Sequence, residues 1–480
     1  MENAAPVLQT KSFIHNEWVG DETKPSLIVK NKFEQIPIAK IPLASQDDIE
    51  KAIQSSLAAF LQFKNTSALE RKDLLEKLFS ALKLEREKFI NLIISEAGKP
   101  HDYASAEIDR ALTIIDVAIH ELMLNRGEVI PMNHPPGIGR TALTKKYPIG
   151  PILAISPFNF PLNLALHKII PALATGNTVI LKPSPQTPLT ALAFASLCKK
   201  VGVPAGVLNV VVCDNAGAEI LVRDERIKML SFTGSADIGW KLKAMAGKKK
   251  VVLELGGNAA AIVDRTANIT ETAKSLATGA FLYAGQICIS TQRIYVDELI
   301  FDQFVDEFKQ HTSELKIGNP EEKGVIVGPV IDRGHLERIH HWIQEAKDLG
   351  AEILMGGEIL DLNHHLYPPT ILTNTKRGMK VVDEEVFGPV VIIEKVKYFD
   401  EVIREINLSR YGLQASLFTN QLSQIKYAEE HLEVGALIIN AIPGFRLDSM
   451  PYGGVKDSGL GREGVKYAME EMCESRLLVY

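Results

Sequence analysis

The sequence ILAISPFNFP, residues 152–161, begins a regular alternation of apolar strands and amphipathic helices that continues to residue 253. We expect strands at 152–155, 178–181, 207–212, 228–232 and 251–253. We expect helices at 162–173, 188–200, 216–222 and 235–245. This pattern predicts a parallel sheet covered by helices on both faces. Ligands of such sheets bind beyond the carboxyl ends of the strands, so a site is expected there.

The flanking segments extend the α/β pattern. Residues 1–44 indicate short strands, and helices follow up to residue 124, two of them opened by Ser-x-x-Asp and Ser-x-x-Glu capping patterns at Ser45 and Ser67. The helix after Ser67 is expected to break before it ends at residues 98–100. Residues 257–465 form a second α/β unit, with helices near 270–284, 299–314 and 334–349 and strands at 293–296 and 390–393.

Two strand-like segments, 141–147 and 476–480, lie outside both α/β units. We expect the C-terminal one to pair with the other or with an edge of another subunit. The predicted fold class is therefore α/β, with two parallel-sheet α/β domains and a β-strand element. The predicted boundaries are 1–125 with 149–256 for the first domain, 257–465 for the second, and 126–148 with 466–480 for the β-strand element.

Composition limits the classes of function. The chain has 480 residues, of which 46% are hydrophobic and 23% charged, as in soluble globular proteins. The net charge of −6 argues against general binding to nucleic acid or to a membrane. Residues 1–6 do not resemble a signal peptide, and no apolar run reaches the ~20 residues of a membrane helix. The four cysteines include no C-x-x-C pair, so we expect neither a zinc site nor disulfides, and a reducing cytoplasm fits a free thiol.

Cys288 lies in the stretch AGQICIS, residues 284–290, where small residues precede the thiol. Such a setting lets a thiol project into a cleft, where the thiolate is the reactive form. The alternative is a buried, inert cysteine, which is the commoner fate of a free thiol.

Polar side chains also follow the predicted strands. Asn159 lies between two prolines and has the chemistry to stabilise an oxyanion, although turn asparagines are common. Glu254 ends a strand before a glycine turn and is a candidate general base, although most glutamates are simply exposed. Lys182 follows a strand, where it either reaches a phosphate or ribose or stays solvated. Ser235 precedes a helix whose N-terminus suits a phosphate, and a simple helix cap is its alternative.

Taken together and in this order, these stretches resemble the aldehyde dehydrogenase superfamily. The segment EEVFGPV, residues 384–390, and the glycine-rich segment PYGGVKDSG, residues 451–459, match the family as well. The resemblance covers essentially the whole chain. It implies that Cys288 attacks an aldehyde carbonyl and that the Asn159 side chain and the Cys288 backbone N–H hold the oxyanion. After hydride transfer, Glu254 would activate the water that hydrolyses the thioester, which favours a free acid over transfer to coenzyme A.

The resemblance also implies that the first domain binds NAD or NADP, that the second is catalytic and that the β-strand element joins subunits into a homodimer or homotetramer. Lys182 would contact the adenosine ribose, Ser235 the pyrophosphate, and Glu385 and Phe387 the nicotinamide riboside. The expected cofactor-binding residues are Ser156, Phe158, Lys182, Ser184, Pro185, Gly234, Ser235, Leu255, Glu385 and Phe387.

Position 185 bears on the choice of cofactor. Members that prefer NAD often carry a glutamate three residues after the lysine, and here that residue is Pro185. Without this carboxylate nothing repels a 2′-phosphate, and Ser184 can hydrogen-bond to it. We therefore expect NADP to be accepted, alongside NAD.

The expected substrate is a small polar or anionic aldehyde, because residues 445–452 resemble members that act on lactaldehyde or phosphonoacetaldehyde. An arginine in this segment can pair with an anionic group, or alternatively lie on the surface beside Asp448. The expected substrate-binding residues are Arg110, His167, Phe445, Arg446 and Tyr452. The pairs His340–His341 and His364–His365 are expected on a helix surface and in a turn, so no metal site is predicted.

Two other classes of function compete with this interpretation. One is a cysteine-dependent esterase or thioesterase without redox chemistry, which would give Lys182, Ser235 and Glu385 no role. The other is a catalytically idle binding protein, which is not expected to retain Cys288, Glu254 and Asn159.

Overall fold

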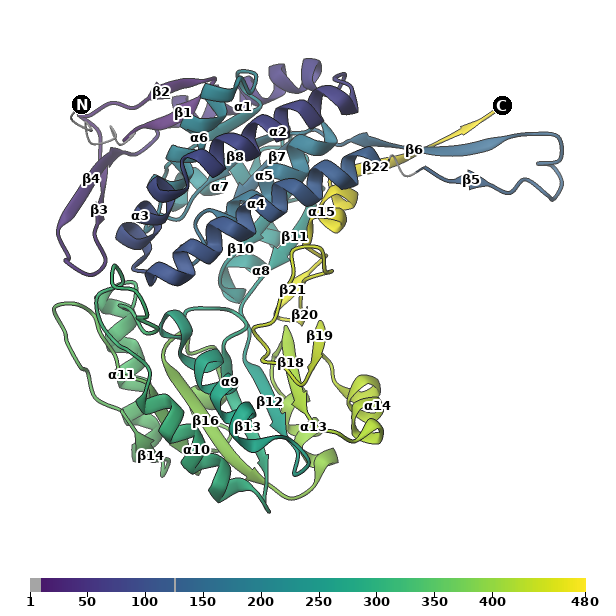
Figure 1. Ribbon diagram of the computed structural model, residues 1–480. Helices are drawn as coiled ribbons and strands as arrows, with labels where there is room; N and C mark the ends of the chain where they lie inside the picture. Colours follow the sequence, from purple (N-terminus) through teal and green to yellow (C-terminus); the bar gives the residue numbers. More distant parts are fainter. Residues whose placement is uncertain (1–9, 125–126) are drawn as a thin grey trace.

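The computed structural model describes residues 10–124 and 127–480. The N-terminal segment 1–6 and the domain boundary expected at 125–126 lie outside these residues. Two sheets, each covered by helices, and a projecting β-arm make up the molecule (Figure 1). The predicted α/β fold class is thereby confirmed.

The first sheet has eight strands in the order β2-β1-β9-β8-β7-β10-β11-β21. The five central strands, β9 to β11 in this order, run parallel to one another. The strands are β1 (Ser12–Ile14), β2 (Glu17–Val19), β7 (Pro151–Ile155), β8 (Thr178–Lys182), β9 (Leu208–Val210), β10 (Met229–Thr233), β11 (Lys250–Glu254) and β21 (Gly459–Leu460). The strand expected at 207–212 is thus shorter than predicted.

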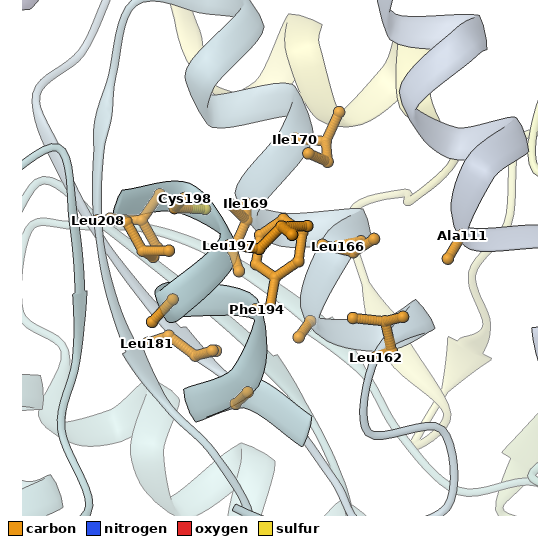
Figure 2. Packing of buried hydrophobic residues seen from close by; sticks show 14 of the residues in the cluster. Ala111, Leu162, Leu166, Ile169, Ile170, Leu181, Phe194, Leu197, Cys198 and Leu208 are labelled. Atoms are coloured by element: carbon orange, nitrogen blue, oxygen red, sulfur yellow. The ribbon is translucent and has the colours of Figure 1, made fainter. Parts of the chain in front are cut away.

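Helices cover both faces of this sheet because successive side chains of a strand point to opposite faces. Ile152 and Ala154 of β7 pack with α2–α6, whereas Leu153 and Ile155 pack with α1, α7 and α8. Figure 2 shows part of the core on the α2–α6 side of this sheet, where Phe194 lies among apolar side chains of α4–α6 and the sheet. The helices are α1 (Gln46–Phe63), α2 (Ala68–Leu84), α3 (Arg86–Ala97), α4 (His101–Met123), α5 (Asn163–Thr175), α6 (Leu189–Val201), α7 (Asn215–Arg223) and α8 (Ala236–Met245).

The second sheet has seven strands in the order β14-β15-β16-β13-β12-β18-β19, with β14 antiparallel to its neighbour. Helices α9 and α10 cover one face, and α11, α13 and α14 cover the other. The strands are β12 (Ala259–Val263), β13 (Thr291–Asp297), β14 (Glu352–Met355), β15 (Thr370–Thr373), β16 (Val390–Val396), β18 (Gln414–Phe418) and β19 (Ala436–Ile439). The helices are α9 (Ile269–Phe281), α10 (Phe301–Ser313), α11 (Arg333–Asp348), α12 (Lys380–Asp383), α13 (Phe399–Asn407) and α14 (Leu422–His431).

The C-terminal part of the chain returns to the first sheet and then leaves the body. Strand β21 pairs with the end of β11, placing Gly459 beside Glu254. Helix α15 (Val465–Glu471) follows, and β22 (Cys473–Val479) pairs antiparallel with β6 (Ala142–Pro148). These strands and β5 (Val129–Ile130) form the projecting arm in Figure 1. The pairing predicted for the two strand-like segments is therefore confirmed within one chain.

Small two-stranded sheets complete the fold: β3 (Ser26–Lys30) with β4 (Pro37–Pro42), and β17 (Tyr411–Gly412) with β20 (Val455–Lys456).

Candidate active site

Cys288 lies in a short loop between α9 and β13. The helix expected to reach residue 284 ends at Phe281, and a 3₁₀ turn, η1 (Leu282–Gly285), follows it. Tyr283, Ala284 and Gly285 all have positive φ values, of 52°, 53° and 66°. A Cβ atom at Gly285 would lie 2.1 Å from the Gly388 carbonyl oxygen, so only glycine fits. Strained backbone of this kind is found at functional sites, where it fixes a side chain in place.

The buried amide of Gln286 anchors this loop. Its Nε2 donates to the carbonyl oxygens of Tyr283 and Pro329, and its Oε1 accepts from the Ile331 backbone N–H. The Gln286 carbonyl oxygen in turn accepts a 2.9 Å hydrogen bond from Nδ2 of Asn159, which lies between β7 and α5. The candidate oxyanion donor is thus tied directly to the loop that carries the thiol.

Two cavities meet at Cys288. The first, of about 440 Å³, extends over the carboxyl ends of β10 and β11 and includes Asn159 and Glu254. The second, of about 220 Å³, lies between α4, α5 and the 442–452 segment. Cys288 and Leu164 line both of them. A thiol at this junction can reach one molecule in each cavity.

Burial raises the pKa of the Cys288 thiol to about 11. A hydrogen bond with Tyr452, whose hydroxyl oxygen lies 3.1 Å from Sγ, acts in the opposite direction. The positive charge of Arg446 also favours the thiolate. Formation of the reactive thiolate therefore depends on these neighbours.

Glu254 is buried at the end of β11. Burial, and then the nearby charge of Glu463, raise the pKa of its carboxyl well above the usual range. Within residues 10–124 and 127–480, neither of its carboxylate oxygens has a hydrogen-bond partner. A buried carboxylate without partners and with a raised pKa has the properties of a general base.

Six of the ten expected cofactor-binding residues line the first cavity: Phe158, Gly234, Ser235, Leu255, Glu385 and Phe387. The remaining four expected residues do not line this cavity: Ser156, Lys182, Ser184 and Pro185. Ser156, Lys182 and Ser184 are buried, and Pro185 is exposed. Burial lowers the pKa of Lys182.

The first cavity suits a dinucleotide. The N-terminus of α8 opens into it, and Ser235 at the N-cap position makes no capping hydrogen bond through its side chain within the described part of the chain. Oε1 of Glu385 accepts from the Gly257 backbone N–H at 2.9 Å, and a Cβ atom at Gly256 would lie 2.3 Å from Oε2. The Phe387 ring packs edge-on against Phe158. One cavity thus contains a helix N-terminus that can bind phosphate, a carboxylate that can accept hydrogen bonds from hydroxyls, and an aromatic wall.

Three of the five expected substrate-binding residues, Arg110, Arg446 and Tyr452, line the second cavity. His167 is buried beside it, with Nε2 2.9 Å from Asp448 Oδ1. Phe445 is 43% exposed and lies outside the lining. The structure therefore brings the two arginines and the tyrosine to the cavity wall, and leaves His167 behind the wall and Phe445 on the surface.

Arg446 does not lie on the surface beside Asp448, which was the alternative to a role in substrate binding. The side chain is only 7% exposed, and its guanidinium lies 3.6 Å from the Tyr452 ring centroid. Asp448 is paired instead with Arg110, at 2.7 Å, and with His167. Arg446 Nη2 approaches His167 Nε2 at 3.2 Å.

Sequence reasoning missed several residues of the site. The buried ion pair of Lys168 and Glu463 lies beside Glu254, and Asn163 lines the second cavity. Arg338 and Trp342, four residues apart on α11, line the first cavity with the Arg338 guanidinium stacked on the indole. Their i,i+4 spacing was a signal for a shared helix face, but the sequence alone does not show that this face meets the other domain.

The histidine pairs lie where they were expected, His340–His341 on α11 and His364–His365 in a turn region. The described residues hold no group of three or more His, Cys, Asp or Glu side chains suited to a metal ion. Among residues 10–124 and 127–480, no helix has both the length and the apolar character needed to cross a membrane.

Comparisons with known proteins identify the family of the chain. Residues 18–478 match the aldehyde dehydrogenase family. The chain is 42% identical to 3-sulfolactaldehyde dehydrogenase of Priestia megaterium, over 100% of this chain and 99% of that protein. It is 37% identical to lactaldehyde dehydrogenase of Methanocaldococcus jannaschii, over 97% and 99%. The crystal structure of NADP-dependent glyceraldehyde-3-phosphate dehydrogenase from Bacillus halodurans, complexed with NADP, superimposes with a TM-score of 0.95 at 35% identity, covering 98% and 99% of the two chains.

The chain therefore belongs to the aldehyde dehydrogenase family. As a member of this family, the protein is an NAD(P)-dependent oxidoreductase that acts on an aldehyde.

Proposed function

We propose that this enzyme oxidises a small polar aldehyde to its carboxylic acid through a thioester on Cys288. The observation that carries the proposal is the position of Cys288 at the junction of the two cavities. The first cavity then holds the cofactor and the second holds the aldehyde, so that both reach the thiol.

The Cys288 thiolate, formed when the thiol releases its proton to water, forms an Sγ–C bond with the aldehyde carbon, and the carbonyl oxygen becomes an oxyanion. The Asn159 amide has two N–H groups, one of which already donates to the Gln286 carbonyl. The second N–H and the Cys288 backbone N–H are the proposed oxyanion donors. Loss of one such donor costs roughly 100-fold or more in rate.

A bound NAD or NADP would supply the hydride acceptor for this oxidation. Gly234 and Ser235 would hold its pyrophosphate at the N-terminus of α8, and the Glu385 carboxylate would accept hydrogen bonds from ribose hydroxyls. Phe387 would lie against the nicotinamide, and Lys182 and Ser184 would contact the adenosine end. Support for these roles comes from the lining of the first cavity, which contains Gly234, Ser235, Glu385 and Phe387.

Glu254 then acts as the general base. It takes a proton from a water molecule whose oxygen attacks the thioester carbon, and the C–S bond breaks to release the acid and the Cys288 thiolate. The raised pKa of the Glu254 carboxyl supports this role because a base accepts a proton more readily as its pKa rises toward the working pH.

The second cavity supports a small polar substrate. At about 220 Å³ it is half the size of the first cavity, and its wall includes Arg110, Arg446 and Tyr452. Asn163 also lines it, and both amide atoms of this buried side chain lack hydrogen-bond partners among the residues that the structure describes. An unsatisfied buried amide is costly, so a polar substrate group is its expected partner. Relatives named for lactaldehyde and 3-sulfolactaldehyde point to the same class.

NADP is the second part of the proposal, accepted alongside NAD. The position three residues after Lys182 is Pro185, which presents no carboxylate to a 2′-phosphate, and Ser184 can donate to one. A structural relative was crystallised with NADP. A preference for NAD of about a hundredfold in kcat/KM would contradict this part.

The oligomer and the compartment complete the proposal. The β-arm joins subunits into a homodimer or homotetramer, and the protein works in the reducing cytoplasm, where Cys288 stays a free thiol.

The test is the initial rate of nicotinamide reduction in a grid that crosses NAD and NADP with lactaldehyde, glyceraldehyde, succinic semialdehyde, phosphonoacetaldehyde, propanal and benzaldehyde. Cys288→Ala should abolish turnover, and Cys473→Ala, a buried cysteine at the start of β22, should retain it. The small polar aldehydes should give the highest kcat/KM. Ester hydrolysis without any reduction of nicotinamide would instead favour the esterase alternative.

A further inference from the structure

The only polar side-chain contact that the structure gives the Cys288 sulfur within the described residues is the Tyr452 hydroxyl, at 3.1 Å. Both groups belong to the wall of the second cavity. Resting on the proposed function, we propose that Tyr452 is a catalytic residue that donates a hydrogen bond to the Cys288 thiolate and stabilises it. This role differs from contact with the aldehyde, which was the role expected for Tyr452.

The direction of the hydrogen bond follows from the chemistry of the two groups. A thiolate has no proton to donate, whereas a phenol donates its O–H. Burial raises the pKa of Tyr452 well above its ordinary value, so the phenol keeps its proton when the thiol ionises. The contact therefore lowers the pKa of Cys288 against the opposing effect of burial.

The hydroxyl is held in place by the surrounding structure. The Tyr452 backbone exchanges two hydrogen bonds with Glu463, of 3.0 and 2.7 Å, and only 6% of the residue is exposed. The Arg446 guanidinium lies 3.6 Å from the centroid of the tyrosine ring. A cation over the ring draws electron density toward itself and makes the O–H a better donor.

The hydrogen bond acts twice in the reaction. It favours the thiolate before Sγ attacks the aldehyde, and again when the C–S bond of the thioester breaks and sulfur recovers its negative charge. Hydrogen bonds to ionised groups are stronger than those to neutral ones, so Tyr452 stabilises the charged forms of Cys288 over the thioester.

The experiment measures alkylation of Cys288 by iodoacetamide as a function of pH, by mass spectrometry of the Cys288 peptide. Neither aldehyde nor cofactor is needed. In Tyr452→Phe the pH midpoint should rise by about one unit, which makes alkylation about tenfold slower at a fixed pH below the midpoint. Tyr103→Phe is the matched control, because Tyr103 lines the same cavity. It should behave as the wild type.

A second variant guards against a folding defect. Fluorotyrosine at position 452 has a more acidic hydroxyl, which is a stronger donor, so the midpoint should fall. An unchanged midpoint in both variants, or an equal shift in Tyr103→Phe, would overturn the role of Tyr452. A wild-type protein that reduces no nicotinamide but shows these shifts would refute the proposed function and leave the hydrogen bond standing.

Discussion

At the scale of one residue, burial makes the Glu254 carboxylate a stronger base. An exposed glutamate is ionised at neutral pH and is too weak a base to activate water. Here burial and the charge of Glu463 raise its pKa, while Lys168, Arg446 and Arg462 act against them. Because only the ionised form accepts a proton, the active fraction of the enzyme grows as pH rises through this raised pKa.

The first prediction concerns this carboxyl. The turnover number of the wild type should fall as pH is lowered, since Glu254 becomes protonated. Glu254→Gln should lose about 100-fold or more in turnover and should lack this pH dependence. Steady-state rates at saturating aldehyde across a pH series test both points. Unchanged turnover in the Gln variant would exclude Glu254 as the base.

The second prediction concerns Asn163. Asn163→Leu keeps the side-chain volume but removes both polar amide atoms. The kcat/KM for lactaldehyde should fall by about tenfold, because its hydroxyl then loses its partner. The value for propanal, which has no hydroxyl, should stay within about twofold. Equal losses for the two aldehydes would mean that Asn163 supports the cavity wall without contacting the substrate.

Residues at strand ends could be predicted from the sequence, and residues in long connections could not. Asn159 and Glu254 follow buried parallel strands, whose carboxyl ends meet at one edge of the sheet. Phe445 and Arg446 lie in the irregular segment 440–452, where no periodic pattern fixes the direction of a side chain. Glu463 reaches Glu254 only because β21 joins the first sheet, a pairing that its two residues could not signal.

At the scale of elements, Gln286 connects the Cys288 loop with the segment after β7 that carries Asn159. Three hydrogen bonds of its side chain connect η1 with residues 329–331, and its backbone carbonyl oxygen accepts a hydrogen bond from the Asn159 side chain. A change at Gln286 therefore affects both the stability of the loop and the geometry of the oxyanion donor.

The third prediction is that Gln286→Leu destabilises the protein by about 2 kcal/mol or more, because buried backbone groups lose their partners. Turnover should fall with little change in KM, since Asn159 and Cys288 lose their relative positions. Thermal unfolding and steady-state kinetics measure the two effects. The control is Gln344→Leu, which removes a half-buried amide on α11 that bonds Gly357. Equal effects of the two substitutions would contradict the special role of Gln286.

Elements with a strong local pattern were predicted well. Both capping boxes at Ser45 and Ser67 are present, and the expected break falls at Glu85, between α2 and α3. The left-handed turn at residues 283–285 was not predicted, because two of its three residues are not glycine and tertiary contacts impose their conformation. Apolar alternation therefore predicts where elements lie, and packing decides how they end.

At the scale of the whole molecule, the β-arm leaves an apolar surface exposed. On β22 and the C-terminus, Leu477, Leu478 and Tyr480 are 61%, 50% and 69% exposed. Exposed apolar residues on an edge strand are costly in a monomer, and a second subunit would cover them.

The fourth prediction follows from this surface. The double substitution Leu477→Asp and Leu478→Asp should convert the proposed oligomer to smaller species, because a charged residue on each face of β22 opposes burial. Sedimentation velocity measures the molecular mass. Leu84→Asp, at an 81% exposed position on α2, is the control and should leave the mass unchanged. An oligomer that survives the double substitution would show that the arm is not required for assembly.

Mass spectrometry of Glu254→Gln after incubation with lactaldehyde and NADP tests whether a thioester forms on Cys288 and needs Glu254 for its hydrolysis. Reduced nicotinamide should form in an amount close to the number of subunits, and the acyl group should be recovered on the peptide containing Cys288. Acylation of another residue, or nicotinamide reduction without any covalent acyl group, would contradict the thioester mechanism on Cys288.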